Sequence, residues 1–201
     1  MSKQIRLGML TPSSNTALEP ITSAMVSGLP NVSAHFSRFT VTEISLRDQA
    51  LCKQITEATG IPATTSVLAL NEILEKTGAR RFGLATPYLD DVQQRIIANY
   101  QRSGLDCSAE RHLDLHVNYS FAEVEEDTIR TMVRALAKEN VQAISTFCTN
   151  LHAAHLAEEL EAETGIPLYD TISTVVWKSL RLAGVDTRTL KGWGRLFREV
   201  E

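Results

Sequence analysis

The sequence has few cysteines and no long apolar run. Its three cysteines, Cys52, Cys107 and Cys148, lie far apart and form no CxxC pair, which argues against a disulfide framework or a zinc ribbon. No apolar stretch approaches the roughly 20 residues that a membrane-spanning helix requires, and the first ten residues lack the pattern of a signal peptide. We therefore expect a cytoplasmic protein with no membrane partner.

The chain also lacks a strong excess of either charge. Twenty Lys and Arg residues face 24 Asp and Glu residues, which gives a net charge of −4, and both signs are scattered along the chain. This distribution argues against a nucleic-acid partner. Neither a GxGxxG motif nor a glycine-rich phosphate loop is present, so we predict no nucleotide cofactor. A hydrophobic content of 43% argues against a disordered chain.

Short apolar runs alternate with helical patterns along the whole sequence. This alternation predicts an α/β fold of parallel sheets flanked by helices. Strands are predicted at residues 5–10, 32–41, from 61 onward, 81–85, 107–113, 143–147 and 167–169. Helices are predicted up to residue 27, up to residue 59, and at 66–76, 89–103, 125–140, 151–164 and 173–183.

An internal repeat divides the sequence into two related halves. Residues 6–12 (RLGMLTP) match residues 81–87 (RFGLATP) at four of seven positions, and a second match relates TGIP at 59–62 to TGIP at 164–167. We predict two halves related by a pseudo-twofold axis, with the active site in the cleft between them. Ligands of such sheets bind beyond the carboxyl ends of the strands. The predicted halves are residues 1–66 with 172–201, and residues 67–171.

The first half is shorter than the second. The two copies of the first match are 75 residues apart, and the two copies of the second match are 105 residues apart. The stretch between the two matching segments is therefore 30 residues shorter in the first half than in the second. A strand with its crossover helix occupies roughly that length. Either the first half lacks such a unit near residues 44–52, or the sequence omits a segment that the protein contains. We favour the second explanation, because losing a central strand leaves its neighbours with unpaired backbone groups.

The polar loop at residues 11–16 (TPSSNT) follows a strand and precedes a helix. Its hydroxyls and backbone N–H groups suit an anion such as a carboxylate. The same residues also commonly cap helices. The sequence leaves both roles open for Ser13, Ser14 and Asn15.

Cys148 ends an apolar strand in the second half and precedes a predicted helix, with Asn150 as a possible N-cap. A helix N-terminus stabilises negative charge, so this position favours a thiolate. The alternative is a small buried structural residue. His152 and His155 follow closely, but a zinc site needs a third well-placed ligand. We interpret both histidines as part of a helix face and predict no metal.

Several of these motifs together resemble maleate cis-trans isomerase, a family of the aspartate/glutamate racemase superfamily. They are TPSSNT at 11–16, TPY at 86–88, Asn118, and FCTN at 147–150. The resemblance implies a homodimeric enzyme that needs no cofactor and acts on a small dicarboxylate. It also implies that Cys148 is catalytic and that the substrate carboxylates are held by Asn15, Tyr88, Asn118, Thr149 and Asn150.

The implied reaction is the conversion of maleate to fumarate. A thiolate adds to the double bond, the bond rotates, and the thiolate is expelled. Members of the superfamily normally carry one cysteine in each half, and the first-half cysteine is missing from this sequence. The alternatives are therefore a decarboxylase of the arylmalonate type that uses only Cys148, another single-cysteine reaction of the superfamily, and an inactive dicarboxylate-binding protein.

Overall fold

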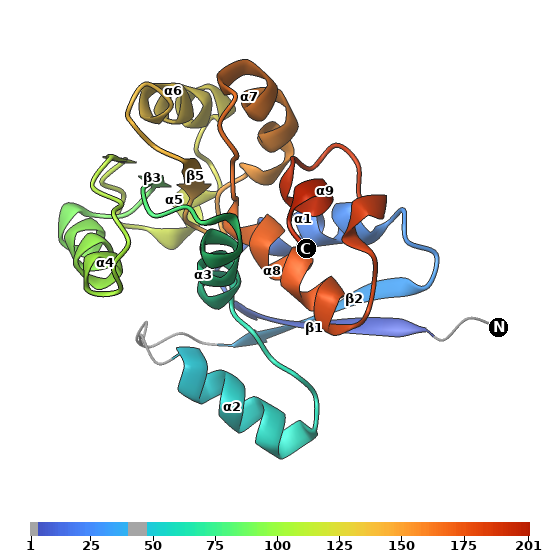
Figure 1. Cartoon of the computed structure of the whole chain (residues 1–201). Helices are drawn as coiled ribbons and strands as arrows, with labels where there is room; N and C mark the ends of the chain where they lie inside the picture. The colour runs from blue at the N-terminus through green and yellow to red at the C-terminus, as the bar shows by residue number, and fades with distance from the viewer. Residues whose placement is uncertain (1–3, 40–47) are drawn as a thin grey trace.

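The computed structural model describes residues 4–39 and 48–201 (Figure 1). The predicted α/β class, with parallel sheets flanked by helices, is confirmed. None of the helices in these two ranges is long and apolar enough to cross a membrane.

The strands are β1 (Ile5–Pro12), β2 (Val32–Phe39), β3 (Phe82–Thr86), β4 (Glu110–His112) and β5 (Ala143–Thr146). The α-helices are α1 (Leu18–Val26), α2 (Asp48–Thr59), α3 (Ser66–Thr77), α4 (Asp90–Arg102), α5 (Asn118–Phe121), α6 (Glu126–Leu136), α7 (Ala157–Thr164), α8 (Thr171–Leu182) and α9 (Leu196–Glu199), and two short 3-10 helices are η1 (Ala154–Leu156) and η2 (Thr187–Thr189).

The strands form two separate parallel sheets. One sheet has the order β1-β2, with Ile5 opposite Val32. The other has the order β4-β3-β5, with Phe82 opposite Ala143. The strand predicted at 167–169 is reduced to one bridge between Ile144 and Leu168. The strand predicted from residue 61 is wrong, because residues 61–65 have no regular secondary structure.

The helices and sheets lie in layers. Figure 1 shows α3 and α8 between the two sheets, with α6 and α7 on the far side of the β3 sheet. One hydrophobic core fills the space around α3 and α8, and it contains Leu7 and Met9 of β1 and Phe82 and Leu84 of β3. A second core packs the opposite face of the β3 sheet against α6 and α7. The β3 sheet is thus covered on both faces.

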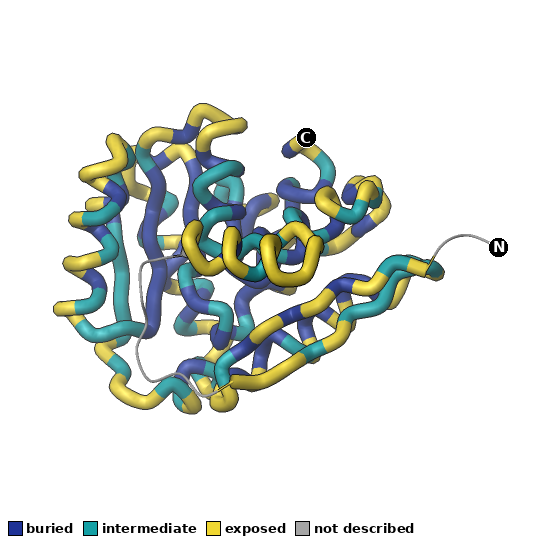
Figure 2. Tube along the Cα trace, turned by 90° about the horizontal axis from the view of Figure 1, so that it is seen from below, coloured by how far each residue is buried: buried dark blue, intermediate teal, exposed yellow. Residues whose placement is uncertain are grey.

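Among the described residues, the β1 sheet is covered on one face only. All five residues of β3 are buried, whereas buried and exposed residues alternate along β1 (Figure 2). Leu10 is 61% exposed, although its counterpart in the repeat, Ala85, is 1% exposed. A central parallel strand is normally buried on both faces, whereas alternation is typical of a half-covered sheet. Within the described ranges, no strand pairs with the second edge of β1.

Two equivalent glycines show the same asymmetry. A Cβ atom built on Gly83 lies 3.2 Å from Cβ of Leu136 on α6 and 3.3 Å from Cγ1 of Ile144 on β5. A Cβ atom built on Gly8 meets no atom of the described residues within 4 Å. Among these residues, Gly8 therefore lacks the close neighbours that α6 and β5 provide for Gly83. The predicted gap near 44–52 lies partly outside the described residues, and the division into halves stays a prediction.

Substituting these glycines by alanine distinguishes the two environments. We expect Gly83→Ala to lower the free energy of unfolding by about 1–2 kcal/mol, because α6 must shift to admit the methyl group. The matched variant Gly8→Ala meets no described neighbour and is expected to change stability by no more than about 0.5 kcal/mol. Urea unfolding followed by circular dichroism measures both values, and equal losses in the two variants contradict this description.

Candidate active site

The pairing of β3 with β5 determines the position of Cys148. The backbone N–H of Phe147 donates to the carbonyl of Ala85 at 2.8 Å, which extends the pairing beyond the end of β5. Cys148 follows directly, at the carboxyl end of the sheet, and is 5% exposed. The predicted location of this cysteine at the carboxyl end of its strand is therefore present in the structure.

The thiol of Cys148 is held in its neutral form. Burial raises the pKa of Cys148 to about 11, and the negative charge of Asp170 adds to this effect. Hydrogen bonds from the backbone N–H of Asn150 and from the Tyr88 hydroxyl act in the opposite direction. The Asn150 N–H lies 3.4 Å from Sγ. At neutral pH the group is a thiol.

The expectation of a stabilised thiolate at a helix N-terminus is therefore wrong. Residues 149–152 form a turn and a bend, η1 begins at Ala154, and α7 begins at Ala157. The segment that follows Cys148 in the sequence thus starts no helix at Asn150, and the burial of the thiol outweighs the nearby N–H donors. Asn150 does not cap α7, and its side chain instead contacts the first half of the chain.

Tyr88 brings an aromatic ring and a hydroxyl to the sulfur. It follows Thr86 and Pro87 at the carboxyl end of β3, and its hydroxyl forms a hydrogen bond with Cys148. Burial raises the pKa of Tyr88 well above its usual value, with a further increase from Cys148. Its ring packs edge-on against Phe121, with 5.6 Å between the centroids. Tyr88 is thus a neutral hydrogen-bond donor beside the thiol.

Asn15 combines the two roles that the sequence left open. Its Oδ1 accepts hydrogen bonds from the backbone N–H groups of Ala17 and Leu18 at the start of α1, at 3.1 and 2.9 Å. Its Nδ2 donates to the carbonyl and the hydroxyl of Thr149, at 2.9 and 3.1 Å. Asn15 therefore caps a helix of the first half and binds the residue that follows Cys148.

Asn150 and Asn118 extend this connection. Oδ1 of Asn150, which is 1% exposed, accepts from the N–H groups of Thr16 and Ala17 at 2.8 and 3.2 Å. Its Nδ2 donates to the carbonyl of Asn118 at 2.6 Å. Nδ2 of Asn118 in turn donates to the Ser14 hydroxyl at 2.5 Å. The structure thus places the loop at 11–16, Asn118 and the residues after Cys148 in one network, while their roles toward a substrate stay predictions.

Among the described residues, the two histidines that follow Cys148 in the sequence, His152 and His155, form no hydrogen bond with its sulfur. Nε2 of His155 lies 2.8 Å from a carboxylate oxygen of Glu126 on α6. Burial lowers the pKa of His152, and the neighbouring His155 adds to this effect. Within the part of the chain that the structure describes, no group of three His, Cys, Asp or Glu side chains is placed to hold a metal ion.

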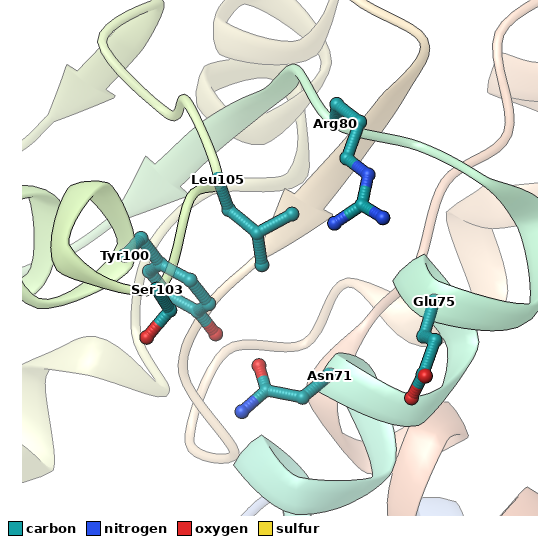
Figure 3. Close-up of a pocket in the computed structure, with 6 residues that line it drawn as sticks. All are labelled: Asn71, Glu75, Arg80, Tyr100, Ser103 and Leu105. Carbon is teal, nitrogen blue, oxygen red and sulfur yellow. The ribbon is translucent and has the colours of Figure 1, made fainter.

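A surface cavity of about 230 Å³ lies apart from these residues, between α3 and the end of α4 (Figure 3). None of the predicted site residues lines it. Its lining residues are Asn71, Glu75, Arg80, Tyr100, Ser103 and Leu105.

The sequence did not single out Asp170. This residue is fully buried, accepts a hydrogen bond from Thr146 at 2.8 Å, and caps α8 through the N–H groups of Ile172 and Ser173. An aspartate directly before a helical pattern is a recognisable N-cap signal. Its closeness to the strand that carries Cys148 depends on tertiary structure.

Solved structures of two kinds of enzyme superpose on this chain over nearly its whole length. The Iso maleate isomerase from Pseudomonas putida S16 superposes with a TM-score of 0.88 at 18% identity, over 98% of this chain and 99% of the other. Unliganded arylmalonate decarboxylase superposes with a TM-score of 0.81 at 24% identity, over 98% and 100% of the two chains. The chain has the fold of these two enzymes, and the predicted resemblance to maleate cis-trans isomerases is confirmed.

Sequence comparison specifies the family. The family model described as arylmalonate decarboxylase matches residues 43–197, so the chain belongs to the arylmalonate decarboxylase family. The arylmalonate decarboxylase of Bordetella bronchiseptica is 34% identical over 75% of this chain and 63% of its own length. A maleate isomerase of Nocardia farcinica is 26% identical over 67% of this chain and 54% of its own length. The matches thus span between half and two thirds of these curated relatives, which are enzymes.

Removing the Asn150 side chain tests the connection between the loop at 11–16 and the segment after Cys148. We expect Asn150→Ala to lower the free energy of unfolding by about 2–3 kcal/mol, because buried N–H and carbonyl groups lose their partners. The exposed Asn140→Ala is the matched control, with an expected change below about 0.5 kcal/mol. Chemical denaturation measures both, and a loss at Asn150 no larger than that at Asn140 contradicts the network.

The protonation state of Cys148 is directly measurable. Alkylation by iodoacetamide requires the thiolate, so its rate at Cys148 is expected to rise with pH throughout the range from about pH 7 to pH 9, with no plateau, because the pKa of the thiol is about 11. Mass spectrometry of the peptide that contains Cys148 separates this signal from Cys52 and Cys107. A rate that levels off below about pH 8 would show that the thiolate is stabilised.

Proposed function

We propose that the protein decarboxylates a malonate that carries an aryl group, without a cofactor, and that Cys148 is the proton donor. The observation that carries this proposal is the neutral Cys148 thiol at the carboxyl end of the sheet, beside the Tyr88 hydroxyl. Membership of the arylmalonate decarboxylase family supports the same reaction.

The proposed chemistry needs only neutral groups. The bond between the central carbon and one carboxylate breaks, carbon dioxide leaves, and the electron pair spreads over the remaining carboxylate as an enediolate. The Tyr88 hydroxyl and the backbone N–H groups after Cys148 stabilise this charge. The Cys148 S–H bond then breaks as its proton forms a new C–H bond, and the resulting thiolate takes a proton from water.

The residues around the thiol contribute differently to substrate binding. The edge-on pair of Tyr88 and Phe121 offers an aromatic surface for the aryl group of the substrate. Thr149 offers a backbone N–H group for a carboxylate, and the N–H of Asn150 reaches one if its bond to the Cys148 sulfur is exchanged. In the structure, the Asn15 and Asn118 side chains already donate to Thr149 and Ser14. We infer that these two asparagines shape the loops and reach a carboxylate only if these bonds are exchanged.

Conversion of maleate to fumarate is the second candidate. It is favoured by the ring of neutral polar side chains near Cys148, which suits a four-carbon diacid, and by the similarity to maleate isomerases. This reaction begins with a thiolate that forms a bond to an olefinic carbon. Because the resting Cys148 is neutral, the isomerase must first remove its proton, and we therefore place this reaction second.

Product analysis with two substrates distinguishes the candidates. We expect the protein to convert phenylmalonate to phenylacetate and carbon dioxide, and we expect Cys148→Ser to lower the rate by about 100- to 10,000-fold, which is typical for the loss of a general acid. Cys52→Ser on α2 is the control and is expected to retain the parent rate. Liquid chromatography measures phenylacetate, and fumarate from a parallel incubation with maleate.

Each of the other outcomes would change the proposed function in a specific way. If the protein converts maleate to fumarate and leaves phenylmalonate unchanged, the isomerase reaction replaces the decarboxylase reaction as its function. Turnover of phenylmalonate that survives Cys148→Ser removes Cys148 from the mechanism. Binding of either diacid in calorimetry without any product supports an inactive dicarboxylate-binding protein.

A further inference from the structure

A buried carboxylate connects the strand of Cys148 to helix α8. Asp170 is fully buried, and its Oδ2 accepts a hydrogen bond from the Thr146 hydroxyl at 2.8 Å. Its Oδ1 accepts from the backbone N–H groups of Ile172 and Ser173, at 2.8 and 3.2 Å, in the first turn of α8. Since Thr146 is the last residue of β5, this side chain bridges the end of the strand and the beginning of the helix.

Other bonds join the same two segments. The Thr171 hydroxyl donates to the carbonyl of Thr146 at 3.2 Å, and the Ser145 hydroxyl donates to the carbonyl of Tyr169 at 2.8 Å. The N–H of Tyr169 donates to the carbonyl of Ile144 at 2.8 Å. Only Phe147 separates Thr146 from Cys148, so the segment that leads to the sulfur is fixed on the side of Asp170.

The groups that bind the Asp170 side chain are all neutral. Burial raises the pKa of Asp170 to about 6, while the Thr146 hydroxyl, the two N–H groups and the more distant charge of His155 act in the opposite direction. Above that pH the carboxylate is charged. Its charge adds to burial in raising the pKa of Cys148, against the hydrogen bonds from Tyr88 and the backbone.

We propose that Asp170 is a positioning residue for Cys148, which fixes the end of β5 against α8 and places a negative charge near the sulfur. This inference rests on the proposed function, in which Cys148 must hold a proton until the enediolate forms. Asp170 does not touch the reacting atoms in this proposal and acts through the strand end and through its charge.

Asparagine separates the charge of Asp170 from its shape. In Asp170→Asn, the amide oxygen can still accept from the N–H groups of Ile172 and Ser173. The amide NH₂ can face the Thr146 hydroxyl, which accepts hydrogen bonds as well as donating them. The variant therefore preserves the contacts and removes the negative charge.

The matched control is a second buried carboxylate that lies outside the site. Glu161 is 4% exposed and accepts hydrogen bonds from the N–H groups of Leu168 and Arg195, at 2.8 and 2.6 Å. It is not among the main causes that set the pKa of Cys148, whereas Asp170 is. Glu161→Gln thus removes a comparable buried charge without altering the surroundings of the sulfur.

The test is the pH dependence of Cys148 alkylation by iodoacetamide in the parent and in both variants, followed on the peptide that contains Cys148. We expect Asp170→Asn to be alkylated about three- to tenfold faster than the parent near pH 8, because a like charge no longer opposes the thiolate. Glu161→Gln is expected to match the parent. Folded Asp170→Asn with the rate of the parent, or equal acceleration in both variants, overturns the proposal.

A second pair of variants serves if Asp170→Asn does not fold. Thr146→Val removes one hydrogen-bond donor from the carboxylate, so Asp170 is protonated at higher pH and Cys148 is alkylated faster near neutral pH. Thr146→Ser keeps the donor and is expected to behave like the parent. Identical rates for these two variants overturn the proposal. The alkylation rate is measured without any substrate. A protein that does not decarboxylate phenylmalonate can therefore still confirm or overturn the role of Asp170.

Discussion

The parallel pairing of β3 with β5 is the constraint on which the candidate site depends. It brings the TPY loop after β3 and the FCTN segment after β5 to the same edge of the sheet, so that Tyr88 and Cys148 meet. Both faces of this sheet are covered, which buries the sulfur and separates it from water. The same burial that supports the fold therefore sets the chemistry of the thiol, because removing a group from water disfavours its charged form.

The two predicted halves of the chain contribute unequally. Gly83 packs closely against α6 and β5, whereas Gly8 has no close neighbour among the described residues and Leu10 is exposed. The first half still reaches the site through the loop at 11–16, since Asn15 binds Thr149 and Asn150 binds the start of α1. The first half thus holds the loops of the second half in place, and Cys148 is the one cysteine found at the site within the described residues.

Much of this arrangement is predictable from the sequence, because it follows from periodicity and from the repeat. A strand that ends in FCTN must place Cys148 at the carboxyl edge of a parallel sheet, and the matching TPSS and TPY loops must lie at corresponding edges. The protonation state of Cys148 is not predictable in this way, because it depends on which groups tertiary structure packs around the sulfur. The same holds for Asp170, whose local signal indicates only a helix cap. The strand expected from residue 61 did not form, which shows that an apolar start after a helix does not by itself make a strand.

The stereochemistry of the product tests most directly whether one fixed thiol delivers the proton. Methylphenylmalonate loses one carboxylate to give an acid with a new stereocentre, and its enantiomeric composition is measurable by chiral chromatography. Because Cys148 is held rigidly on one side of the site, a large excess of one enantiomer is expected from the parent protein. A racemic product formed at the enzymatic rate would mean that water or a mobile group protonates the enediolate, and it would contradict the role given to Cys148.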